Sequence, residues 1–315
     1  MTWRVLVSAP YMQPVLDQYR PVFAENDIEI IVPPVHERLC EAELLDWISS
    51  VDGAICGDDQ FTERVLKTAS RLRVISKWGT GIDSIDCEAA RRLGIVVRNT
   101  PNAFSEPVAD TVLGYMLCFA RQLPWMDLDM RGGTWHKRGG VSLRECTLGV
   151  IGVGNVGKAI IRRASAFGMR ILGHDIVDIG PDFVTETSLN LLSKEDLLHE
   201  ADFVSVNCDL NSISFHLVSE RELTLMKPTA YLINTARGPL VDEAALVRAL
   251  QEQHIAGAAL DVFEIEPLPA ESPLRTLDNV LLAPHNSNSS PRAWERVHEN
   301  TIHNLVEELR KGTAE

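Results

Sequence analysis

Three side chains with acid–base or anion-binding chemistry lie far apart in the sequence, and each follows a strand-like stretch. Arg237 comes after a Tyr-Leu-Ile-Asn run, Glu266 lies in an acidic loop after Ala-Ala-Leu, and His285 comes just after Leu-Leu-Ala-Pro. The carboxyl ends of parallel strands meet at one edge of a sheet, where small ligands bind. We therefore expect these three side chains in one cleft.

The three residue types suit the reduction of a 2-oxo acid. Arginine holds a carboxylate and a carbonyl with a planar fork of permanent charge. Hydride addition to the carbonyl carbon leaves an alkoxide that needs a proton, and histidine supplies one near neutral pH. The Glu266 carboxylate would stabilise the protonated imidazole of His285 and fix its orientation. Each residue alone is also typical of a surface loop, so the interpretation depends on their joint occurrence after a dinucleotide motif.

That motif is the run Gly152-Val153-Gly154-Asn155-Val156-Gly157, a G-x-G-x-x-G between a buried strand and a helical pattern. The first glycine permits a tight turn, the second lets the backbone approach a pyrophosphate, and the third allows close helix–strand packing. The N–H groups at the start of the helix then face the phosphates. The alternative is that the glycines only form a tight turn.

Asp175 lies 18 residues after Gly157, at the end of the next predicted strand. A carboxylate at this position accepts hydrogen bonds from the hydroxyls of the adenosine ribose and repels a 2′-phosphate. No lysine or arginine lies between residues 174 and 180 to bind such a phosphate. The sequence therefore predicts NAD rather than NADP as the cofactor.

Short apolar runs alternate with helical patterns along the whole chain, which is typical of parallel sheets covered on both faces. We predict two doubly wound α/β domains, a substrate-binding domain of residues 1–100 and 290–315 and an NAD-binding domain of residues 101–289, with the site in the cleft between them. Residues 105–130 are predicted to form one long helix with a break near Pro124, and Pro291 begins a last helix that ends near Lys311. The predicted strands are Arg4–Val7, Glu29–Ile31, Gly53–Ile55, Val74–Ser76, Val96–Arg98, Leu148–Ile151, Ile171–Asp175, Phe203–Val206, Tyr231–Asn234, Ala258–Leu260 and Val280–Leu282.

The composition of the 315 residues excludes several classes of protein. The chain has 45% hydrophobic and 23% charged residues and a net charge of −14, which argues against nucleic acid or an anionic membrane as partner. The six cysteines show neither zinc-site spacing nor a disulfide framework, so we expect reduced thiols, a cytoplasmic location and no metal. No secretory signal or transmembrane run is expected either.

Taken together, these segments resemble the D-isomer-specific 2-hydroxyacid dehydrogenase family, and in particular its phosphoglycerate dehydrogenases. The resemblance covers nearly the whole chain and implies a flavodoxin-like substrate domain and a Rossmann NAD-binding domain. It rests on residues 149–157, Asn234-Thr235-Ala236-Arg237-Gly238, residues 260–267, Pro284-His285, residues 77–86, residues 106–110 and Gly133-Thr134-Trp135.

The resemblance implies hydride transfer between C4 of the nicotinamide and C2 of a small D-2-hydroxy or 2-oxo acid, with Arg237, Glu266 and His285 as the catalytic set. It also implies a homodimer built through the NAD-binding domains and their long helix. The cofactor residues it implies are Gly152, Gly154, Asn155, Val156, Gly157, Asp175, Asn207, Asp209, Thr235, Ala236, Arg237, Asp261, His285 and Thr80, with Asp261 on the nicotinamide carboxamide. The substrate residues it implies are Lys77, Trp78, Gly79, Gly81, Arg237 and His285.

The chain departs from the family pattern in three places. Asn207-Cys208-Asp209 stands where relatives have His-x-Pro, and Ser287 stands where a glycine or alanine is usual. The polar run 286–290 either contacts the ligands or forms a hydrogen-bonded turn. The loop 57–60 lacks the arginine expected in a phosphoglycerate enzyme, although Lys77 is placed to bind a distal anion. No regulatory domain is expected after the last helix.

Two other functions fit the same scaffold. An NAD-sensing binding protein, like the C-terminal-binding-protein corepressors, would bind the dinucleotide without turnover, but the complete arginine–glutamate–histidine set argues against it. Formate-oxidising relatives carry glutamine in place of the catalytic glutamate, so Glu266 argues against that reaction.

Overall fold

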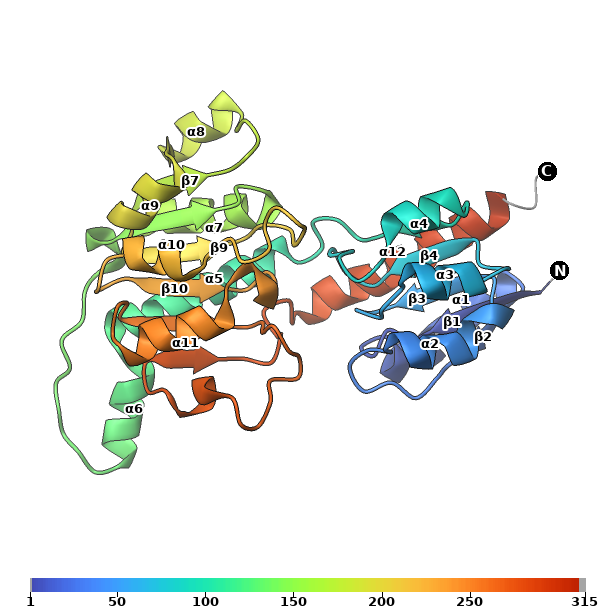
Figure 1. The fold of residues 1–315 in the computed structure, drawn as a ribbon, viewed down its shortest axis with the longest axis horizontal. Helices are drawn as coiled ribbons and strands as arrows, with labels where there is room; N and C mark the ends of the chain where they lie inside the picture. Colours follow the sequence, from blue (N-terminus) through green and yellow to red (C-terminus); the bar gives the residue numbers. More distant parts are fainter. Residues whose placement is uncertain (1, 312–315) are drawn as a thin grey trace. The chain divides into compact units, whose positions relative to one another are not determined.

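The protein is described by a computed structural model that covers residues 2–311 (Figure 1). The chain divides into two compact units, each with its own parallel sheet and hydrophobic core. The first unit holds residues 2–104 and 290–311, and the second holds Ser105–Ser289. Within residues 2–311, no helix combines the length and the apolar character needed to cross a bilayer.

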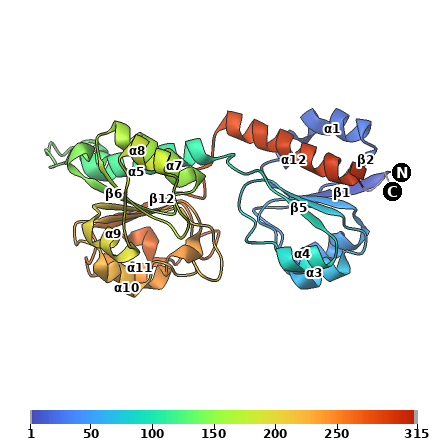
Figure 2. The ribbon, with the colours of Figure 1, turned by 90° about the horizontal axis from the view of Figure 1, so that it is seen from above.

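The first unit has a five-stranded parallel sheet in the order β2-β1-β3-β4-β5, which is the flavodoxin-like order. The helices α2, α3 and α4 cover one face, and α1 and α12 lie on the other (Figure 2). The long last helix is tied to the sheet by the Ser76 hydroxyl, which donates to the Thr301 carbonyl at 2.8 Å. The elements are β1 (Trp3–Val7), α1 (Leu16–Glu25), β2 (Ile28–Ile31), α2 (Glu41–Trp47), β3 (Gly53–Cys56), α3 (Glu63–Thr68), β4 (Val74–Lys77), α4 (Cys87–Arg92), β5 (Val96–Arg98) and α12 (Pro291–Lys311).

The second unit has a seven-stranded parallel sheet in the order β12-β11-β10-β9-β6-β7-β8, which contains the Rossmann order. The helices α5, α7 and α8 cover one face, and α9, α10 and α11 cover the other (Figure 2). Both faces of the central strands β6 and β9 are buried, as expected for apolar strands without alternation. The elements are α5 (Ser105–Arg121), α6 (Leu123–Arg131), β6 (Thr147–Ile151), α7 (Asn155–Ala166), β7 (Arg170–His174), α8 (Pro181–Thr187), β8 (Asn190–Leu191), α9 (Lys194–Glu200), β9 (Phe203–Val206), α10 (Glu220–Leu225), β10 (Tyr231–Asn234), α11 (Glu243–Gln251), β11 (Gly257–Leu260) and β12 (Val280–Leu282).

Six strands of this second sheet end on one common row. The residues that pair across that row, from β7 to β12, are His174, Ile151, Val206, Asn234, Leu260 and Leu282. The loop that leaves each strand therefore begins at the same level of the sheet. Every residue that we predicted to bind the cofactor in this domain, and all three of the catalytic set, lie in or directly after these loops.

The predicted long helix is two helices, and the break precedes Pro124. Gln122 adopts a left-handed conformation with φ of 56°, so α5 ends at Arg121 and α6 begins at Leu123. A proline in a helix removes the bond to the carbonyl four residues earlier and clashes with it. That carbonyl, of Ala120, accepts instead from the Val141 N–H at 2.8 Å. The break that we predicted near Pro124 is therefore confirmed, and it lies at Gln122.

Candidate active site

The glycine motif forms the turn between β6 and α7, and its three glycines meet different surroundings. Gly152 has φ of +90°, and a Cβ there would lie 2.8 Å from the Asn207 carbonyl carbon. A Cβ on Gly157 would lie 2.2 Å from the Gly152 oxygen, whereas a Cβ on Gly154 would have no heavy atom within 4 Å. The protein's own packing thus requires the first and third glycines. The second leaves open space at the N-terminus of α7, as a pyrophosphate requires.

Asp175 braces this turn from the end of β7. Its Oδ2 accepts from the Val153 N–H at 2.6 Å, and its Oδ1 accepts from the Val177 N–H at 3.1 Å. The carboxylate is half-buried, and each of its oxygens has a second lone pair. Its chemistry therefore fits two ribose hydroxyls in addition to its backbone bonds.

The segment Asn207-Cys208-Asp209 follows β9, on the other side of β6 from Asp175. The Asn207 amide donates to the Ser205 carbonyl at 3.1 Å, while Asp209 is exposed. Burial, with a smaller effect of the Asp175 charge, raises the pKa of the Cys208 thiol to about 11. Cys208 is therefore a protonated thiol at neutral pH and lacks the thiolate that nucleophilic chemistry needs.

Arg237 leaves the end of β10 in a tight turn that Asn234 holds. The buried Asn234 amide donates to the Arg237 carbonyl at 2.8 Å and accepts from the Ala236 N–H at 3.1 Å. The next residue, Gly238, packs so closely on the neighbouring loop that a Cβ would lie 1.9 Å from the Phe263 carbonyl carbon. We did not identify Asn234 and Gly238 from the sequence as site residues, although they flank the arginine in the Asn-Thr-Ala-Arg-Gly run.

Glu266 and His285, which are 19 residues apart, form a pair. The His285 Nδ1 lies 3.0 Å from the Glu266 Oε2, and the other carboxylate oxygen of Glu266 accepts from the Phe263 N–H at 2.9 Å. Both side chains are more than two thirds buried. His285 has φ of 50°, in the left-handed region that non-glycine residues rarely occupy. A carboxylate at Nδ1 fixes the orientation of the imidazole and the tautomer that it adopts.

Asp261 holds the loop that carries His285. It is fully buried, and its two carboxylate oxygens accept from the Asn286 and Ser287 N–H groups at 2.7 and 2.8 Å. Its carbonyl accepts from the His285 N–H at 2.7 Å. The polar run after His285 is therefore a hydrogen-bonded turn at its first two residues. The position of the imidazole depends on Asp261 as well as on Glu266.

The donors at this edge of the second sheet fit a dinucleotide. The Thr235 hydroxyl is buried without a hydrogen-bond partner in the described chain, at the position predicted to line the nicotinamide pocket. A ligand bound at the arginine turn could supply the missing hydrogen-bond partner of this hydroxyl. The open space at Gly154 supplies a second, independent fit.

The residues predicted to bind substrate from the first domain lie at the end of β4 and in the loop that follows it. Gly79 has φ of +122°, and its carbonyl accepts from both the N–H and the hydroxyl of Thr100, each at 2.9 Å. The Thr80 hydroxyl donates to the Thr100 carbonyl at 3.1 Å. The buried Trp78 ring donates from Nε1 to the His298 Nδ1 at 2.9 Å. The loop that also contains Gly81 is thus fixed within the first unit.

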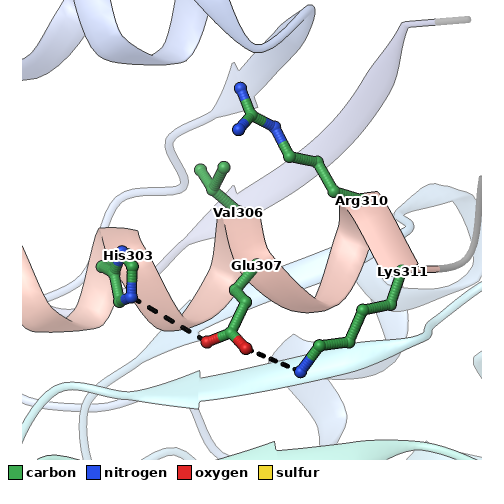
Figure 3. A pocket seen from close by; sticks show the side chains of 5 residues that line it. All are labelled: His303, Val306, Glu307, Arg310 and Lys311. Atoms are coloured by element: carbon green, nitrogen blue, oxygen red, sulfur yellow. Dashed lines mark ion pairs between the residues drawn. The ribbon is translucent and has the colours of Figure 1, made fainter.

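Two other groupings of polar residues contain none of the predicted site residues. The side-chain atoms of His216, Asp242 and Glu264 that could bind a metal lie within 4.8 Å of one another. Asp242, however, caps α11, and Glu264 is hydrogen-bonded to the His216 ring at 2.8 Å. A surface pocket on α12 is lined by His303, Val306, Glu307, Arg310 and Lys311, with Glu307 paired to His303 and Lys311 (Figure 3). Neither grouping contains a predicted site residue.

The sequence of the second unit matches a known domain family. Residues 113–287 match the family described as "D-isomer specific 2-hydroxyacid dehydrogenase, NAD binding domain". A glyoxylate reductase from Korarchaeum cryptofilum is 39% identical over 254 residues, which cover 79% of this chain and 76% of that protein. A D-3-phosphoglycerate dehydrogenase from Methanocaldococcus jannaschii is 38% identical over 281 residues, which cover 88% of this chain and 53% of that protein.

A solved structure matches the chain over nearly its full length. The D-lactate dehydrogenase from Aquifex aeolicus, crystallised with NAD and lactic acid, superposes with a TM-score of 0.86 at 27% sequence identity. The match covers 98% of this chain and 96% of that one. Both predicted domain folds, flavodoxin-like and Rossmann, are confirmed.

Proposed function

Because this chain belongs to the D-isomer-specific 2-hydroxyacid dehydrogenase family, and is thus an NAD-dependent oxidoreductase acting on a 2-hydroxy acid, we propose that it reduces a small 2-oxo acid to the D-2-hydroxy acid with Arg237 and His285 as catalytic residues. One observation carries this assignment. Arg237, Glu266 and His285 follow the adjacent strands β10, β11 and β12, which end at the same level of the sheet, and His285 lies 3.0 Å from Glu266.

Arg237 binds the substrate by charge and by shape. Its guanidinium holds the carboxylate and the neighbouring carbonyl oxygen, because a planar fork with several N–H donors suits both groups. This orients C2 and withdraws electron density from it. When bound, NADH supplies the hydride that adds to C2.

His285 supplies the proton for the oxygen on C2. With Nδ1 donating to Glu266, the imidazolium donates from Nε2 as negative charge develops on that oxygen, and in the oxidative direction the neutral ring accepts the same proton. Glu266 is the positioning residue, since it fixes the ring and balances the charge of the imidazolium. The Phe263 N–H in turn fixes Glu266.

A panel of 2-oxo acids tests the proposal, with glyoxylate and hydroxypyruvate first and NADH oxidation as the readout. His285→Ala is expected to lower kcat about 100-fold to 10,000-fold, the usual contribution of a positioned general acid. His254→Ala is the matched control, because His254 also pairs with a glutamate, Glu252 at 3.3 Å, but on the surface of the same unit. Equal activity of these two variants would contradict the role of His285.

The arginine is tested separately, by substrate binding. Arg237→Ala is expected to raise KM and to lower kcat/KM about 100-fold or more, because the substrate carboxylate loses its partner. Arg248→Ala serves as the control. It removes an exposed arginine of α11 that pairs with Glu220 of α10. If no 2-oxo acid is reduced while NADH binds tightly, the protein is instead an NAD-sensing binding protein.

For the cofactor, we propose a preference for NADH over NADPH. The carboxylate of Asp175 stands at the end of β7 and repels a 2′-phosphate, and no lysine or arginine lies between residues 174 and 180. The ratio of kcat/KM for the two cofactors measures the preference. Better use of NADPH would contradict it.

We also propose a homodimer in the cytoplasm. None of the residues of α6 is buried within the described chain, and Leu128, Met130 and the nearby Trp135 are 64%, 53% and 84% exposed. Such an apolar surface is typical of an interface. The six cysteines are unpaired thiols, which fits a reducing compartment. Light scattering should give a dimer mass for the wild type and a monomer mass for Leu128→Glu; a monomeric wild type would refute the dimer.

A further inference from the structure

A buried ammonium group lies at the loop that we assign to substrate binding in the first unit. Lys77 is the last residue of β4, and its side chain is only 4% exposed. The Nζ donates to the Trp78 carbonyl at 3.1 Å, and a Cβ placed on Gly79 would lie 3.5 Å from it. The positive charge therefore lies directly beneath the Trp78–Gly79 backbone.

The neighbouring strand supplies the counter-charge. Cys56 at the end of β3 pairs in register with Lys77, so the residues that follow β3 lie beside the lysine. The Asp58 Oδ1 lies 3.1 Å from the Lys77 Nζ, and the Asp58 side chain is 40% exposed. The ammonium is thus covered by a carboxylate that reaches the surface.

A second carboxylate lies within the same group of charges. Asp59 is fully buried and accepts from the Ser8 hydroxyl at 2.6 Å and from the Gly57 N–H at 3.1 Å. Burial raises the pKa of Asp59, while these hydrogen bonds and the charge of Lys77 oppose that shift. With Asp59 protonated, the three residues carry no net charge, and with Asp59 ionised they carry a net charge of −1. In neither state does the loop present a surplus positive charge.

We propose that Asp58 is a specificity-determining residue, which neutralises Lys77 so that the enzyme selects 2-oxo acids without a second anionic group. The proposal rests on the proposed function. A cation that binds a phosphate or a distal carboxylate must not already be neutralised by a protein carboxylate. The positive charge of Lys77 is already neutralised by Asp58. A 2-oxo acid that carries only a hydrogen or a hydroxymethyl group on C2 has no second negative charge, so it needs no cation at this position.

A series of variants that changes the local charge in single steps tests the proposal. Relative to the wild type, Asp58→Asn adds one positive charge, Lys77→Met removes one, and the double variant restores the balance. The readout is kcat/KM for 3-phosphohydroxypyruvate divided by kcat/KM for hydroxypyruvate, with NADH. One unit charge about 10 Å from another, at an effective dielectric constant of about 20, changes binding about tenfold, and salt screening offsets the second charge of the phosphate.

We expect the wild type to prefer hydroxypyruvate. The ratio should rise about tenfold in Asp58→Asn, should fall in Lys77→Met, and should return to within about threefold of the wild type in the double variant. Asp52→Asn is the matched control. Asp52 is a buried partner of Arg71, at 2.9 Å, but it precedes β3 at the opposite end of the sheet, so the ratio should not change.

The outcomes separate the two proposals. A ratio unchanged in both single variants, with hydroxypyruvate still reduced, would show that the Asp58–Lys77 pair is only structural and would overturn the inference alone. A wild type that prefers the phosphorylated substrate would also overturn it. A wild type that reduces no 2-oxo acid would overturn the proposed function and the inference together. If Asp58→Asn does not fold, the proposal is tested by Lys77→Met alone, in which the ratio of the two kcat/KM values should fall.

Discussion

Gly238 joins the two loops that carry Arg237 and Glu266, so adding one methyl group there should disturb both. In Gly238→Ala, the new Cβ would lie 1.9 Å from both the carbon and the oxygen of the Phe263 carbonyl and 2.5 Å from the Glu264 nitrogen. All three atoms belong to the backbone, which cannot rotate away as a flexible side chain does. Because ordinary carbon contacts begin at about 3.4 Å, one of the loops must move by about 1.5 Å.

The size of the effect follows from what that loop holds. Glu266 is fixed by the Phe263 N–H, so a shift of Phe263 moves the carboxylate that orients His285. A misplacement of about 1 Å in a catalytic site costs about 100-fold in rate. Overpacking of a buried position costs about 1–3 kcal/mol, which in a domain of this size lowers Tm by about 2–10 °C.

Steady-state NADH oxidation and thermal unfolding measure the two effects on the same samples. Gly180→Ala is the control, because a Cβ there meets no heavy atom within 4 Å, and its kcat should stay within about twofold of the wild type. If Gly238→Ala keeps full activity and an unchanged Tm, the close approach of the two loops is not what positions Glu266, and the reasoning fails.

Three further predictions concern single contacts in the second unit. Gly154→Ala should fold normally, since its Cβ meets no protein atom within 4 Å, yet it should weaken NADH binding at least about tenfold in a fluorescence titration. Asp261→Asn should lower the free energy of unfolding by about 1–3 kcal/mol and lower kcat, because an amide NH₂ cannot accept from both the Asn286 and the Ser287 N–H. Burial alone would raise the pKa of Glu222, but hydrogen bonds from Ser219 and Lys194 lower it to about 2, so its stabilising contribution is complete above about pH 4.5 and is lost as the pH falls toward 2. Glu222→Gln should therefore cost about 3 kcal/mol at pH 7 and almost nothing near pH 2, as measured by denaturant unfolding across pH.

The strands were predictable where an apolar run is buried on both faces. The prediction for β9 matches the observed Phe203–Val206, because all four residues are buried and the run is apolar apart from Ser205. The strand β8 was missed, since Asn190 and Leu191 are both exposed at the edge of the sheet and form no apolar run. The break near Pro124 was also predictable from the sequence, whereas the bond from the Val141 N–H to the freed Ala120 carbonyl joins two segments that no local pattern connects.

In the candidate site, too, some features were predictable from local sequence and others depend on tertiary contacts. Residue types and strand ends were enough to predict that Glu266 would lie beside His285, because their loops leave adjacent strands of one sheet. The roles of Gly238 and Asn234 depend on how closely two backbones approach, which no spacing in the sequence records. The sequence predicted Lys77 as a cation for a distal anion. Its pairing with Asp58 depends on the register of β3 on β4, which the sequence alone does not show.

The common row on which six strands of the second sheet end bears on how proteins of this kind diverge. Each of these loops begins at the same layer of the sheet, so an insertion or deletion within one loop leaves the starting points of the others in place. Selection can therefore alter the segment after β9 without displacing the histidine after β12. The carboxylate after β7 and the histidine after β12 thus occupy separate positions on one layer, and either can change while the other keeps its place.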